Sequence, residues 1–101
     1  MTEKWLERTE LLIKESGSEK LKNANVLIVG LGGVGSFAAE FIARAGIGNL
    51  TIVDGDDVDI TNINRQLPAL HSTKGKMKAD VVSERLLDIN PKLNLTVVKK
   101  F

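Results

Sequence analysis

The chain has 101 residues, the size of one small domain or of part of a larger one. Fourteen Lys and Arg against thirteen Asp and Glu give a net charge of +1, so no overall field directs the chain to nucleic acid or to a membrane surface. The absence of cysteine excludes disulfides, thiolate zinc ligands and a thiol nucleophile within these residues.

Residues 1–20 are expected to form an amphipathic helix. Apolar residues recur at spacings of three and four between Trp5 and Ile13, and Ser16-Gly17-Ser18 is expected to end the helix. The segment lacks the apolar core of a signal peptide, and no window reaches the roughly 18 apolar residues of a membrane span. We therefore expect a cytoplasmic protein with no membrane segment in this portion.

Residues 21–101 are expected to form the first part of a nucleotide-binding domain. The aliphatic run 26–29 is typical of a strand buried on both faces, and we expect it to be the central strand of a parallel sheet. A helix with apolar residues four apart follows a glycine turn and is expected to end at Gly46. A β-branched run at 50–53 predicts the second strand, joined through a right-handed crossover.

A third helix and a third strand follow. Apolar residues recur at helical spacing from Ala79 to Ile89, Asn90-Pro91 is expected to end that helix, and residues 93–98 alternate as a strand. Together the elements predict a Rossmann-like three-layer α/β fold with a parallel sheet, here its N-terminal β-α-β-α-β portion preceded by the amphipathic helix. Because three strands leave a sheet edge exposed, we expect the chain to be the N-terminal part of a longer protein.

The stretch GLGGVG fits the pattern G-x-G-x-x-G, with Gly30, Gly32 and Gly35 at its fixed positions. It follows a predicted strand and opens a predicted helix, whose free N–H groups and partial positive charge favour a bound phosphate. Asp54 ends the next strand, where an acidic residue often bonds a ribose hydroxyl, although an aspartate there is also a common turn former. The sequence predicts a site for a mononucleotide or dinucleotide.

The residues after Asp54 decide between these nucleotides. A helix N-terminus can hold the two phosphates of a dinucleotide, whereas a triphosphate with about four charges needs cationic side chains or a metal ion. Arg65 can fork onto phosphate oxygens, and Lys78 is expected in the first turn of the third helix, near the strand ends. A lysine there opposes the helix dipole, which disfavours a purely structural role. The two cations favour a triphosphate.

Four motifs, in this order and spacing, resemble those of the ThiF/MoeB superfamily, the adenylating enzymes related to ubiquitin-activating enzymes. They are the glycine loop, the D-x-D of Asp54 and Asp56, the N-x-x-R-Q of residues 62–66 and the G-x-x-K that ends at Lys78. The resemblance covers the chain from about residue 21 onward. Within the superfamily, TNINRQLPAL and ERLLDINP look most like the tRNA threonylcarbamoyladenosine dehydratases.

The resemblance implies a role for each matched residue. The glycine loop, with Gly33 foremost, would lie against the phosphates of ATP, and Asp54 would bond the ribose with Asp56 beside it in the same acidic loop. The implied ligands also include a magnesium ion, but the family's magnesium-binding aspartate lies after the point where this sequence ends. We therefore do not expect the chain to complete catalysis alone.

The same resemblance supplies the expected catalytic residues. Asn62 and Arg65 would contact the nucleotide, Arg65 at the phosphates, while Gln66 supports the site. Lys78 would join Arg65 in neutralising the triphosphate, which makes these two the expected catalytic pair. Arg8 is similar in position to an arginine that in this family reaches the nucleotide of the partner subunit, so the resemblance also implies a homodimer.

The implied reaction is attack of a substrate carboxylate on the α-phosphate of ATP, giving an acyl adenylate and pyrophosphate. In the dehydratases the carboxylate belongs to threonylcarbamoyladenosine in tRNA, and loss of AMP closes a ring. In the alternative, it is the C-terminal glycine of a ubiquitin-like sulfur-carrier protein. Two interpretations of another class stay open: an NAD-dependent oxidoreductase, which has no reason to carry TNINRQ and Lys78, and a non-catalytic nucleotide-binding module.

Overall fold

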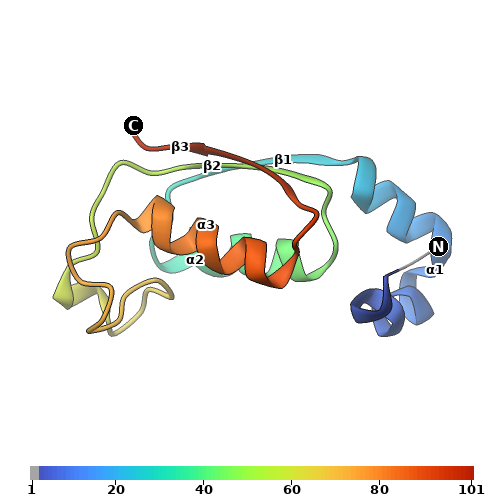
Figure 1. The fold of residues 1–101 in the computed structure, drawn as a ribbon, viewed down its shortest axis with the longest axis horizontal. Coiled ribbons are helices and arrows are strands. Elements are labelled where there is room, and N and C mark those ends of the chain that lie inside the picture. The colour runs from blue at the N-terminus through green and yellow to red at the C-terminus, as the bar shows by residue number, and fades with distance from the viewer. Residues whose placement is uncertain (1–2) are drawn as a thin grey trace.

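The computed structural model describes residues 3–101 and forms a three-stranded sheet packed against two helices (Figure 1). A short N-terminal turn and a longer helix precede the sheet. The elements in chain order are η1 (Lys4–Leu6), α1 (Glu7–Asn23), β1 (Asn25–Val29), α2 (Gly33–Arg44), β2 (Asn49–Val53), η2 (Ile60–Asn62), α3 (Lys78–Ile89) and β3 (Asn94–Val98). The predicted β-α-β-α-β order is confirmed.

All strand pairs are parallel, in the order β1-β2-β3. Asn25, Asn49 and Asn94 are in register at the amino ends of the strands, and Val29 and Val53 pair at the carboxyl ends. Each strand is connected to the next through a helix, which is the connection that parallel pairing requires. The carboxyl ends of the strands therefore lie at one edge, together with the segments that enter α2 and α3 (Figure 1).

Helices α2 and α3 cover the same face of the sheet (Figure 1). The core lies between them and the strands, and its fully buried members include Leu50, Ile52 and Leu86. The Rossmann-like α/β fold is confirmed, and within the described residues the chain carries two of the three expected layers, the sheet and one layer of helices.

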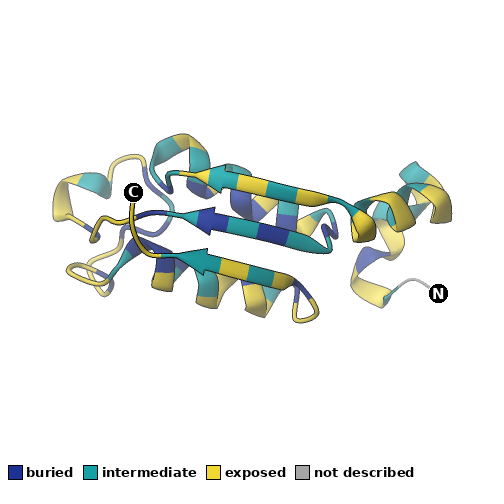
Figure 2. Cartoon of the chain, turned by 90° about the horizontal axis from the view of Figure 1, so that it is seen from above, coloured by how far each residue is buried: buried dark blue, intermediate teal, exposed yellow. Residues whose placement is uncertain are grey.

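The expectation for the first strand is wrong in one respect. In the described chain β1 is an edge strand and β2 is central, and Leu27 and Val29 of β1 are 63% and 64% exposed (Figure 2). An unbroken aliphatic run does not show which face a helix will cover, since side chains alternate between the two faces. Here both helices fall on the face opposite to Leu27 and Val29.

The N-terminal helix also differs from expectation. α1 runs to Asn23 but consists of two helical stretches joined by a kink at Lys14, with φ 65° and ψ 172°, so the first stretch ends before Ser16-Gly17-Ser18. A Cβ added at Gly17 would lie 2.8 Å from the Cβ of Ile13, so the glycine permits a close approach between the two stretches at the kink. The division into residues 1–20 and 21–101 stays a prediction.

α1 extends away from the sheet beyond the amino ends of the strands (Figure 1). None of its residues is buried, and Leu12 is 84% exposed, whereas Leu6 of η1 is buried and packs against Gly46. Among residues 3–101, no helix combines the length and the apolar content that a membrane crossing needs.

Candidate nucleotide site

The glycine loop joins β1 to α2 in a conformation that needs two of its glycines. Gly30 has a φ of +94°, a region that L side chains rarely adopt. A Cβ added at Gly35 would lie 1.8 Å from the carbonyl oxygen of Gly30, so only glycine lets the helix start this close to the strand. No side chain caps the N-terminus of α2. Its first N–H groups are therefore open to an anion.

Asp54 follows β2 and is bonded to two loops at once. It is 2% exposed; its Oδ2 accepts the Leu31 N–H at 2.7 Å, and its Oδ1 accepts the Asp56 N–H at 2.7 Å. Both carboxylate oxygens thus bond backbone of this chain. Asp56 itself is exposed in the loop after β2. The ribose contacts expected of Asp54 and Asp56 stay predictions.

The motif N-x-x-R-Q forms the short helix η2 and the turn after it. The Asn62 Oδ1 accepts the Asp59 N–H at 2.9 Å, and the Asp59 Oδ1 accepts the Thr61 N–H at 2.8 Å, so the turn is capped from both sides. Hydrogen bonds from Thr61 hold the pKa of the exposed Asp59 carboxyl below its usual value. The amide oxygen of Asn62 therefore shapes the loop, and its contact with a nucleotide stays a prediction.

Two residues of the motif lie against the glycine loop. A Cβ added at Gly33 would meet the Arg65 carbonyl oxygen at 3.7 Å, and one added at Gly32 would meet the Gln66 Nε2 at 3.7 Å. Gln66 is 9% exposed, and its Oε1 is buried without a hydrogen-bond partner in the described chain. The structure thus brings Gln66 and the glycine loop together, as expected of a supporting residue.

The guanidinium of Arg65 is on the surface of the same loop. Its Nη1 donates to the Asn64 Oδ1 at 2.8 Å and to the Thr61 carbonyl at 3.3 Å. Arg65 forms no ion pair within residues 3–101. An exposed arginine with neutral partners can turn toward an anion, because its guanidinium carries further donors.

Lys78 is the first residue of α3, which confirms its expected position in the first turn. Its backbone N–H donates to the Asp56 carbonyl at 3.0 Å, and an isolated antiparallel bridge pairs Asp57 with Met77 just before it. Lys78 is 6% exposed, yet its amine forms no hydrogen bond or ion pair within residues 3–101. Lys78 is close enough to Asp59 to contribute to the lowered pKa of that carboxyl. A lysine that is covered this far and forms no ion pair is unusual in a fold, which makes it a candidate for a ligand site.

Arg8 does not join this group in the chain. It lies on α1, beyond the amino ends of the strands, while η2 is at the opposite end of the molecule (Figure 1). Its expected contact is with the nucleotide of a partner subunit, and that contact stays a prediction.

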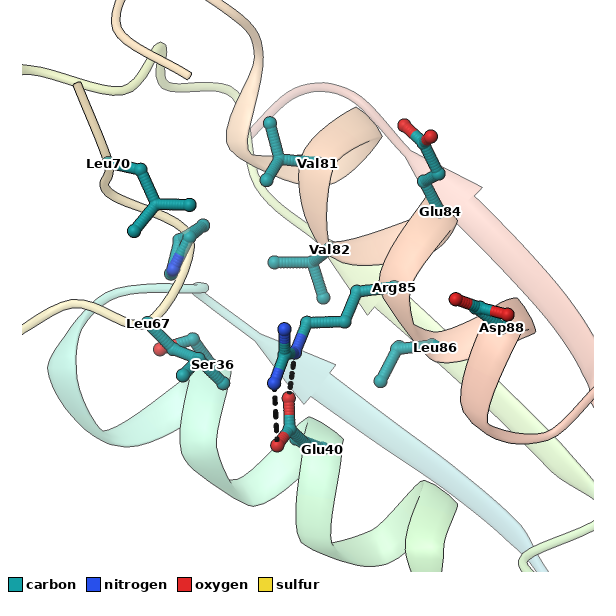
Figure 3. A pocket seen from close by; sticks show the side chains of 11 residues that line it. Ser36, Glu40, Leu67, Leu70, Val81, Val82, Glu84, Arg85, Leu86 and Asp88 are labelled. Atoms are coloured by element: carbon teal, nitrogen blue, oxygen red, sulfur yellow. Dashed lines mark hydrogen bonds and ion pairs between the residues drawn. The ribbon is translucent and has the colours of Figure 1, made fainter. Parts of the chain in front are cut away.

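One interaction near the site was missed by sequence reasoning. Glu40 of α2 is 8% exposed; its Oε2 accepts Arg85 Nη2 and Arg44 Nε, each at 3.3 Å, and its Oε1 accepts Arg85 Nε (Figure 3). These bonds, with Arg85 foremost, hold the pKa of Glu40 below its usual value. The pair borders a cavity of about 440 Å³ between α2, α3 and the segment 67–70. Only the four-residue spacing of Glu40 and Arg44 could have indicated it.

Within residues 3–101 no group of three or more His, Cys, Asp or Glu side chains is placed to hold a metal ion. The carboxylate of Asp54, which bonds the glycine loop, already accepts two backbone N–H groups. The described side chains therefore do not make up a magnesium site.

The arrangement joins a glycine loop, an open helix N-terminus, a capped N-x-x-R-Q turn and a buried lysine at one edge of the sheet. The family model described as ThiF family matches residues 6–101. The chain belongs to the ThiF family.

Several named enzymes are similar to this region. The tRNA threonylcarbamoyladenosine dehydratase of Bacillus subtilis is 54% identical over 93% of the chain, and the molybdopterin-synthase adenylyltransferase of Escherichia coli is 44% identical over 81%. The crystal structure of the E. coli dehydratase in complex with ATP is 45% identical over 99% of the chain, with a TM-score of 0.92. The chain spans 37%, 33% and 42% of the lengths of these three relatives, respectively.

Proposed function

We propose that this chain carries the nucleotide site of an ATP-dependent adenylating enzyme. The observation that carries the proposal is the side chain of Lys78, which is 6% exposed at the carboxyl edge of the sheet and whose amine forms no hydrogen bond or ion pair within residues 3–101. Ligands of open parallel sheets bind at that edge. A solved relative, 45% identical to this chain, is described in complex with ATP, which supports a triphosphate in place of NAD.

In the proposed reaction, a carboxylate oxygen attacks the α-phosphorus of ATP. A new carboxylate-phosphate bond forms, the bond to the β-phosphate breaks, and pyrophosphate leaves. The N–H groups of α2 and the glycine loop orient the phosphates, Asp54 bonds the ribose, and Asn62 contacts the nucleotide. Arg65 and Lys78 stabilise the charge that develops on the α-phosphate and the leaving group. No nucleophilic side chain is needed for this step.

Magnesium enters the proposal as the ion that accompanies ATP. It supplies charge neutralisation on the phosphates. The described carboxylates do not form a site for it, so no step of the proposed reaction is assigned to a metal held by these residues.

We propose the carboxylate of threonylcarbamoyladenosine in tRNA as the substrate, activated so that loss of AMP closes a ring. The identity of 54% to a dehydratase, against 44% to a molybdopterin-synthase adenylyltransferase, supports this choice. The C-terminal glycine of a ubiquitin-like sulfur carrier is the second candidate, favoured by that 44% identity and by 39% identity to the sulfur carrier protein ThiS adenylyltransferase of E. coli.

The proposal includes a homodimer in the cytoplasm, where ATP and tRNA are available. Arg8 would reach the partner's nucleotide from α1, which extends away from the sheet and buries none of its residues in this chain. Residues 1–20 would then act as an arm and residues 21–101 as part of the nucleotide-binding domain.

Two measurements on the full-length protein test the proposal. Isothermal titration should detect binding of ATP with magnesium and no binding of NADH. A preference for NADH would contradict the adenylation hypothesis. ATP-pyrophosphate exchange should be stimulated by tRNA that carries threonylcarbamoyladenosine. Stimulation by a ubiquitin-like carrier alone would favour the second candidate, and no exchange with either, despite ATP binding, would favour a non-catalytic nucleotide-binding module.

A further inference from the structure

Asp54 differs from the other polar residues at the carboxyl edge, because both of its oxygens already have partners in the chain. Gln66 keeps a buried oxygen without a partner, and Lys78 keeps an unpaired amine. The carboxylate of Asp54 accepts two backbone N–H groups at 2.7 Å, a length typical of charge-assisted bonds. At 2% exposure it is the most buried of these side chains.

The first of the two bonds determines the path of the glycine loop. Leu31 lies between Gly30, with its φ of +94°, and Gly32, which precedes the first turn of α2. The Gly30 N–H donates to the Val53 carbonyl at 2.7 Å, and the Leu31 N–H donates to Asp54. Two successive N–H groups of the glycine loop are thus bonded to the end of β2 and the residue after it. Without the carboxylate, the N–H of the fully buried Leu31 would lose its partner.

The second bond holds the segment on which α3 begins. Asp54 accepts the Asp56 N–H, and the Asp56 carbonyl accepts the Lys78 N–H at 3.0 Å. The isolated bridge between Asp57 and Met77 joins the same two segments. A path of hydrogen bonds therefore runs from Leu31 through the carboxylate of Asp54 to the first residue of α3.

We propose that Asp54 is a positioning residue for the phosphates: its carboxylate holds the glycine loop and the start of α3 in the relative positions that a polyphosphate requires. This inference rests on the proposed function and deepens it, since it gives Asp54 a role in binding the phosphates and not only the ribose. Asp54 acts here through Leu31 and Asp56, not through contact with the phosphates.

The test compares ATP with inorganic triphosphate, a probe without ribose, in the wild type and in Asp54→Asn. Asparagine keeps the size of the side chain but replaces one acceptor oxygen with a donor, which cannot accept an N–H. Affinities for both probes should fall by a similar factor of at least about tenfold, the loss expected for a charge-assisted hydrogen bond. Asp57→Asn is the matched control, because Asp57 is exposed in the same loop and its side chain forms no hydrogen bond within residues 3–101. It should change neither affinity.

A ribose-only role predicts a different result: Asp54→Asn would weaken ATP and leave triphosphate binding unchanged, and that result would overturn the inference. Failure of the wild type to bind either probe would instead count against the proposed function. The amide proton resonances of Leu31 and Asp56 provide a second readout. Asparagine keeps only one acceptor oxygen, so at least one of the two bonds is lost in Asp54→Asn and that resonance should shift upfield. A stable variant with both resonances unshifted contradicts the inference.

If Asp54→Asn does not fold, an experiment on the wild type tests the inference. Coupling between two events is reciprocal. If the two hydrogen bonds of Asp54 favour phosphate binding, phosphate binding must therefore stabilise those hydrogen bonds. Saturating triphosphate should slow hydrogen exchange at the Leu31 and Asp56 amides. Unchanged exchange at both amides would overturn the inference.

Discussion

At the amino end of the strands, Asn90 is 5% exposed and its amide donates to the Ala43 and Ile47 carbonyls, at 3.3 and 3.0 Å. At the carboxyl end Lys78 is equally buried, at 6%, and its amine has no partner within residues 3–101. Leaving a buried polar group unpaired costs about 1–3 kcal/mol, and more for a charge. Similarly buried polar side chains therefore have different roles at the two ends: at the amino end they stabilise the fold, and at the carboxyl end they stay available for a ligand.

The largest expected effects come from a pair of glycines, one at each end. A Cβ at Gly35 would lie 1.8 Å from the Gly30 carbonyl oxygen, and a Cβ at Gly48 would lie 1.8 Å from the Lys22 carbonyl oxygen. Gly35→Ala and Gly48→Ala should each lower the free energy of unfolding by about 3 kcal/mol, the upper end for overpacking. Only Gly35→Ala should also abolish ATP binding by the folded protein, because it moves the first turn of α2.

Urea unfolding and isothermal titration of the folded variants separate the two glycines. Gly32→Ala serves as the stability control, since the nearest atom to its added Cβ is 3.7 Å away, an ordinary contact. Equal losses of ATP affinity in folded Gly35→Ala and Gly48→Ala would contradict the division of roles between the two ends.

The next effect concerns Lys78. In Lys78→Met the long side chain stays and the charge is removed, so no partner within the described chain is lost. The affinity for ATP should fall by about 10 to 100 fold, the equivalent of one hydrogen bond to a charged group. The free energy of unfolding should change little, because no hydrogen bond or ion pair within the described chain is lost. A large loss of stability with unchanged affinity would assign Lys78 to the fold instead.

Much of this organisation could be predicted from local patterns. The strands, the glycine loop and the place of Lys78 at the start of α3 follow from short-range periodicity and from turn residues, which act within a few positions of the chain. What the sequence could not show depends on contacts between distant segments. The bond from Leu31 to Asp54 spans 23 positions, and that from Arg85 to Glu40 spans 45.

The same reason explains the two corrected expectations. The exposure of Leu27 and Val29 on β1 depends on which face of the sheet α2 and α3 cover, and an aliphatic run carries no information about that. The kink of α1 at Lys14 brings Ile13 close to Gly17, a contact that the spacing of apolar residues does not show. Asn90 is an intermediate case: its place before a proline predicts a helix end, but its two bonds to distant carbonyls appear only in the structure.

Asn90 gives the third prediction. Asn90→Ala removes the donor of the Ala43 and Ile47 carbonyls and should lower the free energy of unfolding by about 1–2 kcal/mol, because both carbonyls lose a partner in the interior. ATP affinity should stay within experimental error. Asn94→Ala is the control, since the exposed Asn94 amide bonds only the Asn49 side chain, at 3.0 Å. A loss of affinity in Asn90→Ala would show that the two ends are coupled.

The smallest expected effect concerns Glu40, a charged residue that forms ion pairs and lies between the two ends. Arg85 holds the pKa of Glu40 below its ordinary 4.5, so this carboxylate contributes stability above the unfolded pKa, and the contribution is lost as pH falls through the folded pKa. In urea unfolding, the free energy of unfolding of the wild type should exceed that of Glu40→Gln by at most about 1 kcal/mol at pH 7, because the arginines are half exposed. The difference should shrink as the pH falls below 4.5 and through the folded pKa. Exposed Glu84, which has no ion pair within residues 3–101, provides Glu84→Gln as the control with no such pH dependence. Unchanged ATP affinity in Glu40→Gln would show that Glu40 stabilises the fold, as the buried polar group at the amino end does. A loss of affinity would show that residues along α2 also contribute to ligand binding.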